Sequence, residues 1–318
     1  MKVIDIINNN KEETLFSFEV LPPKKGEDIK HLYNCISPLM DFDPAFIDVT
    51  YHREEYVEKT MPNGDIKLVT TRKRPGTVGI CAAIIHKYKV DVVPHLICGG
   101  FSRDETENAL IDLNFLGIDN VLALQGDKLK TEDNFIEAEE GNKYASDLVE
   151  QIMNLNKGIY LDEVLENTAK TDFSVSVAGY PEKHYAARSM EDDLKYLKQK
   201  VDLGADYVVT QMFFDNQKYF DFVDRCREMG INVPIIPGLK PLSTKRQVEI
   251  LPDVFFIGMP EDLRNAVKAC KNNDAVKEIG IEWAIQQSKE LKKRGVPVLH
   301  YYTMSKAIAT QEIAKAVF

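Results

Sequence analysis

Short apolar runs recur along the chain, and most end in a residue that can donate or accept a hydrogen bond or ionise. About eight of these runs are strand-like, at residues 16–21, 45–49, 92–94, 120–124, 173–178, 207–209, 233–236 and 298–302. Between them, apolar residues repeat with a helical period at 105–116, 147–155, 191–203, 219–229 and 284–291. This alternation of strand and helix predicts a parallel sheet covered by helices.

The length of the chain indicates how this sheet is arranged. A chain of 318 residues is typical of a (β/α)8 barrel with insertions, and no linker-like segment divides it. We therefore predict an α/β fold, a TIM barrel, in a single domain spanning residues 1–318. Reactions in such barrels take place where the strands end.

Two polar segments are predicted to be insertions after the second and fourth strands. Residues 53–76 are highly charged and contain Pro62, Asn63 and Gly64, a turn signal that is compatible with a hairpin. Residues 128–143 form a second polar loop, which fits a solvated surface loop better than an acidic binding tail. Since both follow strands, both are expected on the catalytic face, where they could act as lids.

Glu19 is the most informative single residue. It stands in an apolar run that Pro22 and Pro23 stop, so its carboxylate is expected near the end of a buried strand. Such a group is either paired with a cation or an amide, or kept for chemistry. The many polar residues at the other strand ends favour chemistry.

Composition excludes several classes of partner and site. A net charge of -10 argues against a nucleic-acid surface. No apolar run approaches the ~20 residues that cross a membrane, and the first residues lack the apolar core of a signal peptide, so we expect a cytoplasmic protein with small-molecule partners. The five scattered cysteines, with no C-x-x-C pair, predict reduced thiols, and His95 with Cys98 lacks a second cluster to complete a metal site. Neither the Rossmann nor the P-loop motif is present, so any dinucleotide must bind in another way.

Ordered motifs along nearly the whole chain resemble the methylenetetrahydrofolate reductase family. These motifs lie at residues 18–23, 49–51, 94–96, 123–127, 144–148, 178–184, 210–215, 236–238 and 301–303. The chain resembles the short bacterial form, without the regulatory domain of the animal enzymes. The resemblance implies that FAD binds in the barrel mouth, that NADH or NADPH reduces it, and that the hydride then passes to methylenetetrahydrofolate in a ping-pong sequence that supplies methyl groups for methionine synthesis. It also implies a homo-oligomer, a dimer or tetramer.

The resemblance gives two carboxylates catalytic roles. Glu19 becomes the general acid that helps to open the five-membered ring of the folate, and its apolar neighbours favour the protonated form. Asp127 becomes an anion that stabilises the cationic iminium and favours hydride departure. From the residues alone, Asp127 fits an ordinary Gly-Asp turn equally well.

Binding residues follow from the same motifs. The positions implied to contact FAD are Thr50, Tyr51, His95, Gln125, Gly126, Asp127, Tyr144, Ala145, Tyr180, His184, Asp193 and Lys200. Residues 144–147 open a predicted helix, whose free amides could receive pyrophosphate oxygens. Lys200 could match a phosphate or belong to a solvated helix face. The positions implied to contact substrate are Glu19, Gln211, Gln247, Tyr302 and Lys306.

The chain also departs from the family pattern. Gln125 stands where many relatives have Arg, Tyr196 and Gln199 replace an Asn and an Arg, and Lys306 replaces an Arg that has a bidentate fork. Leu251 stands where an aromatic residue can stack on the substrate. The FAD phosphates would thus meet fewer positive charges, and whether the arginines at 72 and 74 compensate is open.

Two other functions fit the same barrel, and the choice between NADH and NADPH is undecided. One is a lyase or aldolase acting on a small acid, with Glu19 or Lys200 as base. The other is a non-catalytic folate-binding barrel.

Overall fold

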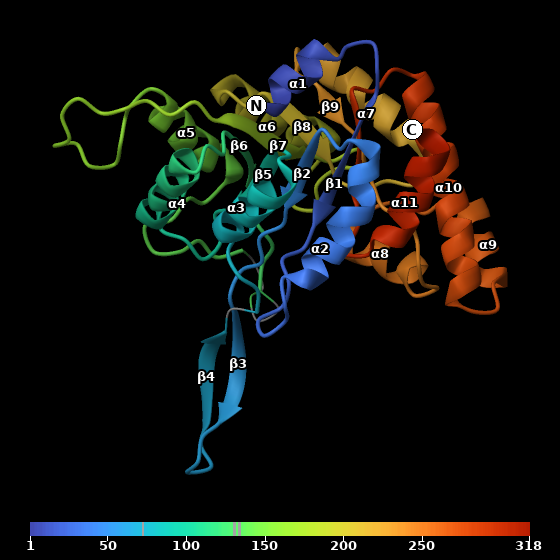
Figure 1. The fold of residues 1–318 in the computed structure, drawn as a ribbon, viewed down its shortest axis with the longest axis horizontal. Coiled ribbons are helices and arrows are strands. Elements are labelled where there is room, and N and C mark those ends of the chain that lie inside the picture. The colour runs from blue at the N-terminus through green and yellow to red at the C-terminus, as the bar shows by residue number, and fades with distance from the viewer. Residues whose placement is uncertain (72, 130–131, 133–134) are drawn as a thin grey trace.

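A parallel β-barrel forms the centre of the molecule (Figure 1). The computed structural model describes residues 1–71, 73–129, 132 and 135–318. The barrel strands are β1 (Leu15–Val20), β2 (Phe46–Val49), β5 (Val92–Ile97), β6 (Asn120–Leu124), β7 (Ser174–Gly179), β8 (Tyr207–Thr210), β9 (Ile235–Ile236), β10 (Gly238–Leu239) and β11 (Val298–Tyr302). They pair in parallel in the order β10-β11-β1-β2-β5-β6-β7-β8-β9. The predicted TIM barrel is confirmed.

The seventh position of the barrel is shared by two short strands. Ile235 pairs with Val208 of β8, whereas Gly238 pairs with His300 of β11. Pro237 separates them because it has no N–H to donate to a ladder. The sequence places this strand at 233–236, but pairing begins at Ile235 and resumes beyond Pro237.

The third barrel strand, β5, is longer than the sequence predicts. We expected it to end at Pro94, but it continues to Ile97, so His95 lies within the strand and is buried. Val92 to Pro94 pair with β2, and His95 to Ile97 pair with β6 on the other side. The missing N–H of Pro94 therefore does not end the strand, because the next residues use the opposite neighbour.

Helices cover the outside of the barrel, and α1 packs against the end of the barrel opposite the hairpin (Figure 1). They are α1 (Val3–Asn9), α2 (Lys30–Ile36), α3 (Thr77–Tyr88), α4 (Arg103–Phe115), α5 (Ala145–Asn156), α6 (Met190–Leu203), α7 (Asn216–Glu228), α8 (Gln247–Phe255), α9 (Glu261–Ala269), α10 (Asn273–Lys293) and α11 (Ala307–Val317), with a 3-10 turn η1 (Ser37–Phe42). The five predicted helical segments are found in α4, α5, α6, α7 and α10. Val3 and Ile7 of α1 pack against buried residues of the strands, among them Phe46 and Tyr207. In the part of the chain that the structure describes, no helix is both long and apolar enough to cross a membrane.

The first insertion is a hairpin, as its turn signal allows. Strands β3 (Glu55–Thr60) and β4 (Ile66–Thr71) pair antiparallel, and the hairpin extends from the barrel at the end opposite α1 (Figure 1). Arg72 lies outside the described residues. Arg74 donates a hydrogen bond to the carbonyl of Pro22, which follows Glu19's strand.

The second insertion, residues 128–143, includes 130–131 and 133–134, which lie outside the described residues. Glu132 in this segment forms an ion pair with Arg53, which lies at the start of the first insertion. Arg53 Nη1 is 3.0 Å from Glu132 Oε2. Both side chains are largely buried, so the two insertions contact each other beside the mouth. Their action as lids remains a prediction.

Candidate active site

A cavity of about 1170 Å³ opens at the mouth of the barrel, where the strands end. Thirteen of the residues predicted for the site line it, namely Glu19, Thr50, Tyr51, His95, Gln125, Gly126, Asp127, Tyr180, His184, Gln211, Gln247, Tyr302 and Lys306. Motifs separated by almost the whole chain therefore converge on one cavity.

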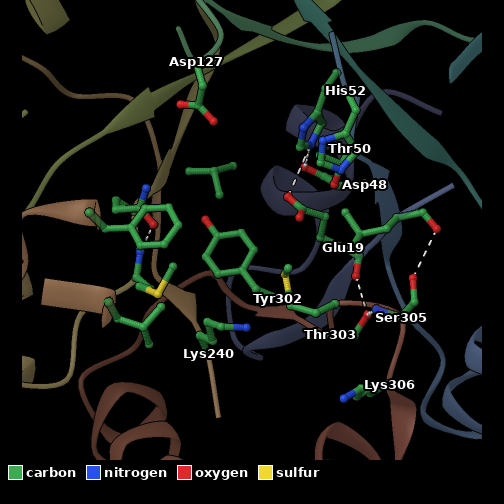
Figure 2. A pocket seen from close by; sticks show the side chains of 18 of the residues that line it. Glu19, Asp48, Thr50, His52, Asp127, Lys240, Tyr302, Thr303, Ser305 and Lys306 are labelled. Atoms are coloured by element: carbon green, nitrogen blue, oxygen red, sulfur yellow. Dashed lines mark hydrogen bonds and ion pairs between the residues drawn. The ribbon is translucent and has the colours of Figure 1, made fainter. Parts of the chain in front are cut away.

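Glu19 is positioned by the contacts between the ends of β1 and β11. The Thr303 hydroxyl donates to the carbonyl oxygen of Glu19 at 2.6 Å, and the Ser305 hydroxyl donates to that of Leu21 at 3.2 Å (Figure 2). Glu19 and Tyr302 are the last pair of the ladder between β1 and β11, and these two side-chain bonds continue the contact between the strands past that pair. The Glu19 carboxylate stays 13% exposed and faces the cavity.

Behind Glu19 lies a buried cluster of ionisable groups. His95 Nε2 is 3.6 Å from Glu19 Oε2 and 3.3 Å from Asp48 Oδ2. Burial lowers the pKa of His95, but the hydrogen bond to Asp48 and the charges of Glu19 and Asp48 more than offset it, so the pKa is raised. His300, whose Nδ1 is 2.8 Å from Ser17 Oγ, has its pKa lowered by burial against the opposing charges of Asp48 and Glu19.

Tyr302 reaches across the mouth toward β8. Its hydroxyl donates to the Thr210 carbonyl at 2.6 Å, and burial raises its pKa well above the usual range. A Cβ atom on Gly238 would lie 2.4 Å from that hydroxyl and 2.3 Å from the Thr210 carbonyl oxygen. Only glycine fits at the start of β10 while Tyr302 keeps this position.

Gln211 and Gln247 present amide donors to the cavity. The side-chain oxygen of Gln211 accepts from the amide of Met212 at 2.9 Å, and that of Gln247 accepts from the amide of Ser243 at 2.6 Å. Because both oxygens are used internally, their NH₂ groups are the parts left for a ligand.

Asp127 enters the cavity from a different side than Glu19 (Figure 2). It follows Gly126, whose φ of 86° is in the left-handed region that favours glycine. Unlike Glu19, Asp127 is exposed. Burial, Asp193 and then Asp127 raise the pKa of Tyr180, whose ring lines the same cavity.

Four of the predicted FAD residues do not line the cavity but lie close to it. Asp193 and Lys200 belong to α6, and the Asp193 carboxylate accepts from the amide of His184 at 2.8 Å. Lys200 Nζ donates to the Ala178 carbonyl at 2.9 Å, and burial lowers its pKa to about 8 against the opposing charge of Asp193. Burial and the neighbouring Lys200 and Lys183 lower the pKa of His184 to about 4, so its ring is neutral.

Tyr144 and Ala145 open α5 beside the mouth. The side chain of Gln125 donates to the Lys143 carbonyl at 2.9 Å, which joins the end of β6 to this helix start. The Asp147 carboxylate already accepts from the amide of Tyr144 at 3.0 Å. Within the described residues, the amides of Ala145 and Ser146 donate to no protein acceptor, so these two are available to an anion.

The structure adds two buried ionisable residues that sequence reasoning missed. Asp48 is 1% exposed at the side chain, and its only signal is a carboxylate inside the apolar run 45–49. Lys240 is 9% exposed and lines the cavity just beyond β10. Burial lowers the pKa of Lys240 to about 8. The negative charge of Glu19 opposes this shift, and the positive charge of Lys306 adds to it.

The charge of the cavity differs from that of the chain. Its lining includes five basic residues, Arg53, Lys128, Lys240, Lys277 and Lys306, and three acidic ones, Glu19, Asp48 and Asp127. The whole chain carries -10. The mouth therefore suits an anionic ligand.

The sequence pattern that defines the methylenetetrahydrofolate reductase family matches residues 2–317. The chain belongs to this family. A methylenetetrahydrofolate reductase (NADH) 1 of Arabidopsis thaliana is 33% identical over 317 residues, covering 96% of this chain and 49% of the plant protein. The 5,10-methylenetetrahydrofolate reductase of Salmonella typhimurium is 32% identical over 292 residues, covering 92% of this chain and 86% of the bacterial one. The chain thus spans about half the length of the plant relative.

Among solved structures, an uncharacterized protein from Clostridium thermocellum that binds two copies of 5-methyl-5,6,7,8-tetrahydrofolic acid has a TM-score of 0.59. It is 15% identical, and the match covers 99% of this chain and 98% of that one, so it supports the fold. Three residues at which this chain departs from the family pattern lie in different surroundings. Tyr196 and Gln199 are exposed on α6, whereas Leu251 is buried in the cavity lining.

Proposed function

We propose that this protein reduces 5,10-methylenetetrahydrofolate to 5-methyltetrahydrofolate with NADH or NADPH, using bound FAD in a ping-pong sequence. The observation that carries the proposal is the Glu19 carboxylate, whose backbone is held by Thr303 just beyond β11, and which faces the space that Asp127 enters from another side. Family membership supports the same reaction. We also propose that residues 1–318 form one catalytic domain.

The residues around the mouth fit FAD. The Thr50 hydroxyl is buried without a hydrogen-bond partner and lines the cavity, so it is available to a polar ring edge. The amides of Ala145 and Ser146 suit phosphate oxygens, as does the ammonium of Lys200 beside Ala178. When bound, FAD would supply hydride transfer between the two substrates.

In this proposal Glu19 supplies the proton for ring opening. Its carboxyl group donates to the folate nitrogen that leaves the methylene carbon, and the remaining nitrogen forms an iminium that can accept a hydride. Its low exposure excludes most competing water from the carboxyl group. Asp127, from its own side, places a negative charge near the cation as it forms.

Gln211 and Gln247 support a site shared by the two substrates. Each directs an NH₂ donor at the cavity, and both a pterin and a nicotinamide amide offer carbonyl acceptors. Lys306 and Lys240, which lie close enough to influence each other, add positive charge to the same cavity, which suits the carboxylates of a folate tail.

The test is the absorption spectrum of the purified protein, recorded anaerobically. Flavin absorption at about 450 nm should disappear with NADH or NADPH and return with methylenetetrahydrofolate. Protein without flavin and without any turnover would support the lyase or aldolase reading. Flavin that NADH or NADPH cannot reduce, in protein that binds folate, would support the non-catalytic folate-binding barrel.

A further inference from the structure

His95 on β5 lies close to two carboxylates, Glu19 on β1 and Asp48 on β2. Its Nε2 atom is 3.3 Å from Asp48 Oδ2 and 3.6 Å from Glu19 Oε2, so both acids address one ring nitrogen. Register places Glu19 directly opposite Asp48 across β1 and β2, and His95 belongs to the next strand, β5. The backbone of three neighbouring strands therefore builds this arrangement.

The arrangement is suited to holding one positive charge. Asp48 and His95 are almost completely buried, and Asp48 Oδ1 has no hydrogen-bond partner among the described residues. His300 Nε2 also lies 4.0 Å from Asp48 Oδ2, but burial lowers the pKa of His300, so the nearer His95 is the cationic partner of the Asp48 charge. Two buried carboxylates beside a neutral ring would repel each other, whereas an imidazolium offsets both. The raised pKa of His95 is consistent with that charge distribution.

Other ionisable groups face this cluster from the surrounding elements. They are His300 and Tyr302 on β11, Tyr207 on β8, Cys81 on α3 and Lys240 beyond β10. Burial keeps the tyrosines and the cysteine neutral by raising their pKa values, and keeps His300 neutral by lowering its pKa. Lys240 is the one further group among these that can carry a charge at neutral pH.

We propose that His95 stores, between Asp48 and Glu19, the proton that Glu19 delivers to the folate, and that Asp48 is a positioning residue that keeps His95 charged. The proposal rests on the proposed function for the step at Glu19. It gives His95 a role in proton supply in addition to its expected contact with FAD.

The proton balance is simple. At rest His95 holds the proton and Glu19 is a carboxylate. The Nε2 proton of His95 passes to Glu19 Oε2, and Glu19 then gives it to the leaving nitrogen of the folate. This leaves a neutral imidazole, and Glu19 is again a carboxylate. After product leaves the mouth, a proton from water recharges His95.

The first test measures His95 itself, in protein without ligands. Ring nitrogen signals of the six histidines are followed by ¹⁵N NMR against pH, and His95→Gln identifies the signal of His95. In wild type, His95 should titrate above its ordinary value of about 6.5. Asp48→Asn should lower this midpoint by about 1 unit or more, because a charge and a hydrogen bond are lost.

Two variants keep this test decisive. Tyr207→Phe removes a hydroxyl that faces Asp48 without removing a charge, and it should leave the His95 midpoint unchanged. If Asp48→Asn does not fold, Glu19→Gln removes the other carboxylate and should lower the midpoint in the same direction. An identical His95 midpoint in wild type and in the folded carboxylate variants would overturn the proposal.

The second test measures the oxidation of reduced flavin by methylenetetrahydrofolate in stopped flow between pH 6 and 9. A proton held on a group with a raised pKa is present at low pH and lost as pH rises through that value. The rate should therefore fall at high pH, and Asp48→Asn should move this fall to lower pH by about 1 unit. The NADH half-reaction of the same variant is the reference, because flavin reduction takes no proton from Glu19. A proportional loss in both half-reactions at every pH would assign Asp48 a structural role only. Wild type that never oxidises its flavin with folate would refute the proposed function, while the NMR titration would still test the charge on His95.

Discussion

Replacing Glu19 with Gln separates proton transfer from every other property of the site. The amide keeps nearly the same volume in a position that is only 13% exposed. His95 Nε2, which pairs with this carboxylate among the described residues, is 3.6 Å away, beyond the usual 2.7–3.2 Å of a hydrogen bond, so the substitution breaks no strong bond to it. The backbone oxygen that Thr303 holds is untouched. The variant should fold with a change in unfolding free energy of about 1 kcal/mol or less.

The expected effect on chemistry is much larger. A positioned general acid contributes about 10²- to 10⁴-fold to the rate, which corresponds to roughly 3–5 kcal/mol of barrier. An amide cannot supply that proton, so oxidation of reduced flavin by methylenetetrahydrofolate should slow by this factor. Flavin reduction by NADH needs no proton from Glu19 and should change by less than about twofold.

Anaerobic stopped flow measures the two half-reactions separately at about 450 nm. Thermal unfolding and flavin content of the same preparation serve as controls for folding and cofactor binding. Folate turnover near the wild-type rate would remove Glu19 from the mechanism. Equal slowing of both half-reactions would show that Glu19 positions the cofactor and does not donate a proton.

Three further predictions follow from other parts of the site. Asp127→Asn removes an anion from the cavity, so the flavin potential should rise and the folate half-reaction should slow by ~10- to 1,000-fold; a potentiometric titration with unchanged potential and equal losses in both half-reactions would favour an ordinary turn at Asp127. Gln125→Arg adds a charge beside the start of α5 and should slow FAD loss on dilution and increase the salt dependence of that loss, whereas unchanged or faster loss would mean that other groups already neutralise the phosphates. Gly238→Ala places a methyl group 2.3 Å from a carbonyl oxygen and should cost about 1–3 kcal/mol of stability in urea unfolding. The matched control Gly79→Ala has no atom within 4 Å of the new methyl group and lies in α3, so it should be neutral or stabilising; equal effects of both glycine substitutions would contradict the packing argument.

Much of the fold could be predicted because each barrel strand has a local signature. The runs at 120–124 and 298–302 are bounded in the structure as the sequence places them, since their apolar residues are buried and polar residues follow. The split of the seventh strand could not be predicted, because Pro237 ends one pairing while Gly238 begins another with a strand some 60 residues away in sequence. Long-range pairing of this kind leaves no local pattern.

The site divides in the same way. Residues at or just beyond strand ends, such as Glu19 and Asp127, could be placed at the mouth because strand ends meet at one face of a barrel, while their roles remain predictions. Asp48 and Lys240 could not, because nothing beside them in sequence distinguishes a buried charge with a role from a surface one. Only the three-dimensional arrangement of β1, β2 and β5 shows that the carboxylates of Asp48 and Glu19 both lie near His95 Nε2.

The basic lining of the mouth on an acidic chain has a consequence for how ligands arrive. An anion approaching from solution meets the field of a body with charge -10, which slows diffusion toward the surface at low ionic strength. In physiological salt that field decays over about 8 Å, so the anion travels almost freely until it is close to the rim. Lys277 and Lys306 then attract it over a short range, with the low-dielectric walls of the cavity concentrating their field, whereas the charge of Arg53 is offset by Glu132. Added salt should thus speed the encounter at first and weaken capture only at higher concentration, so the association rate of an anionic ligand should pass through a maximum.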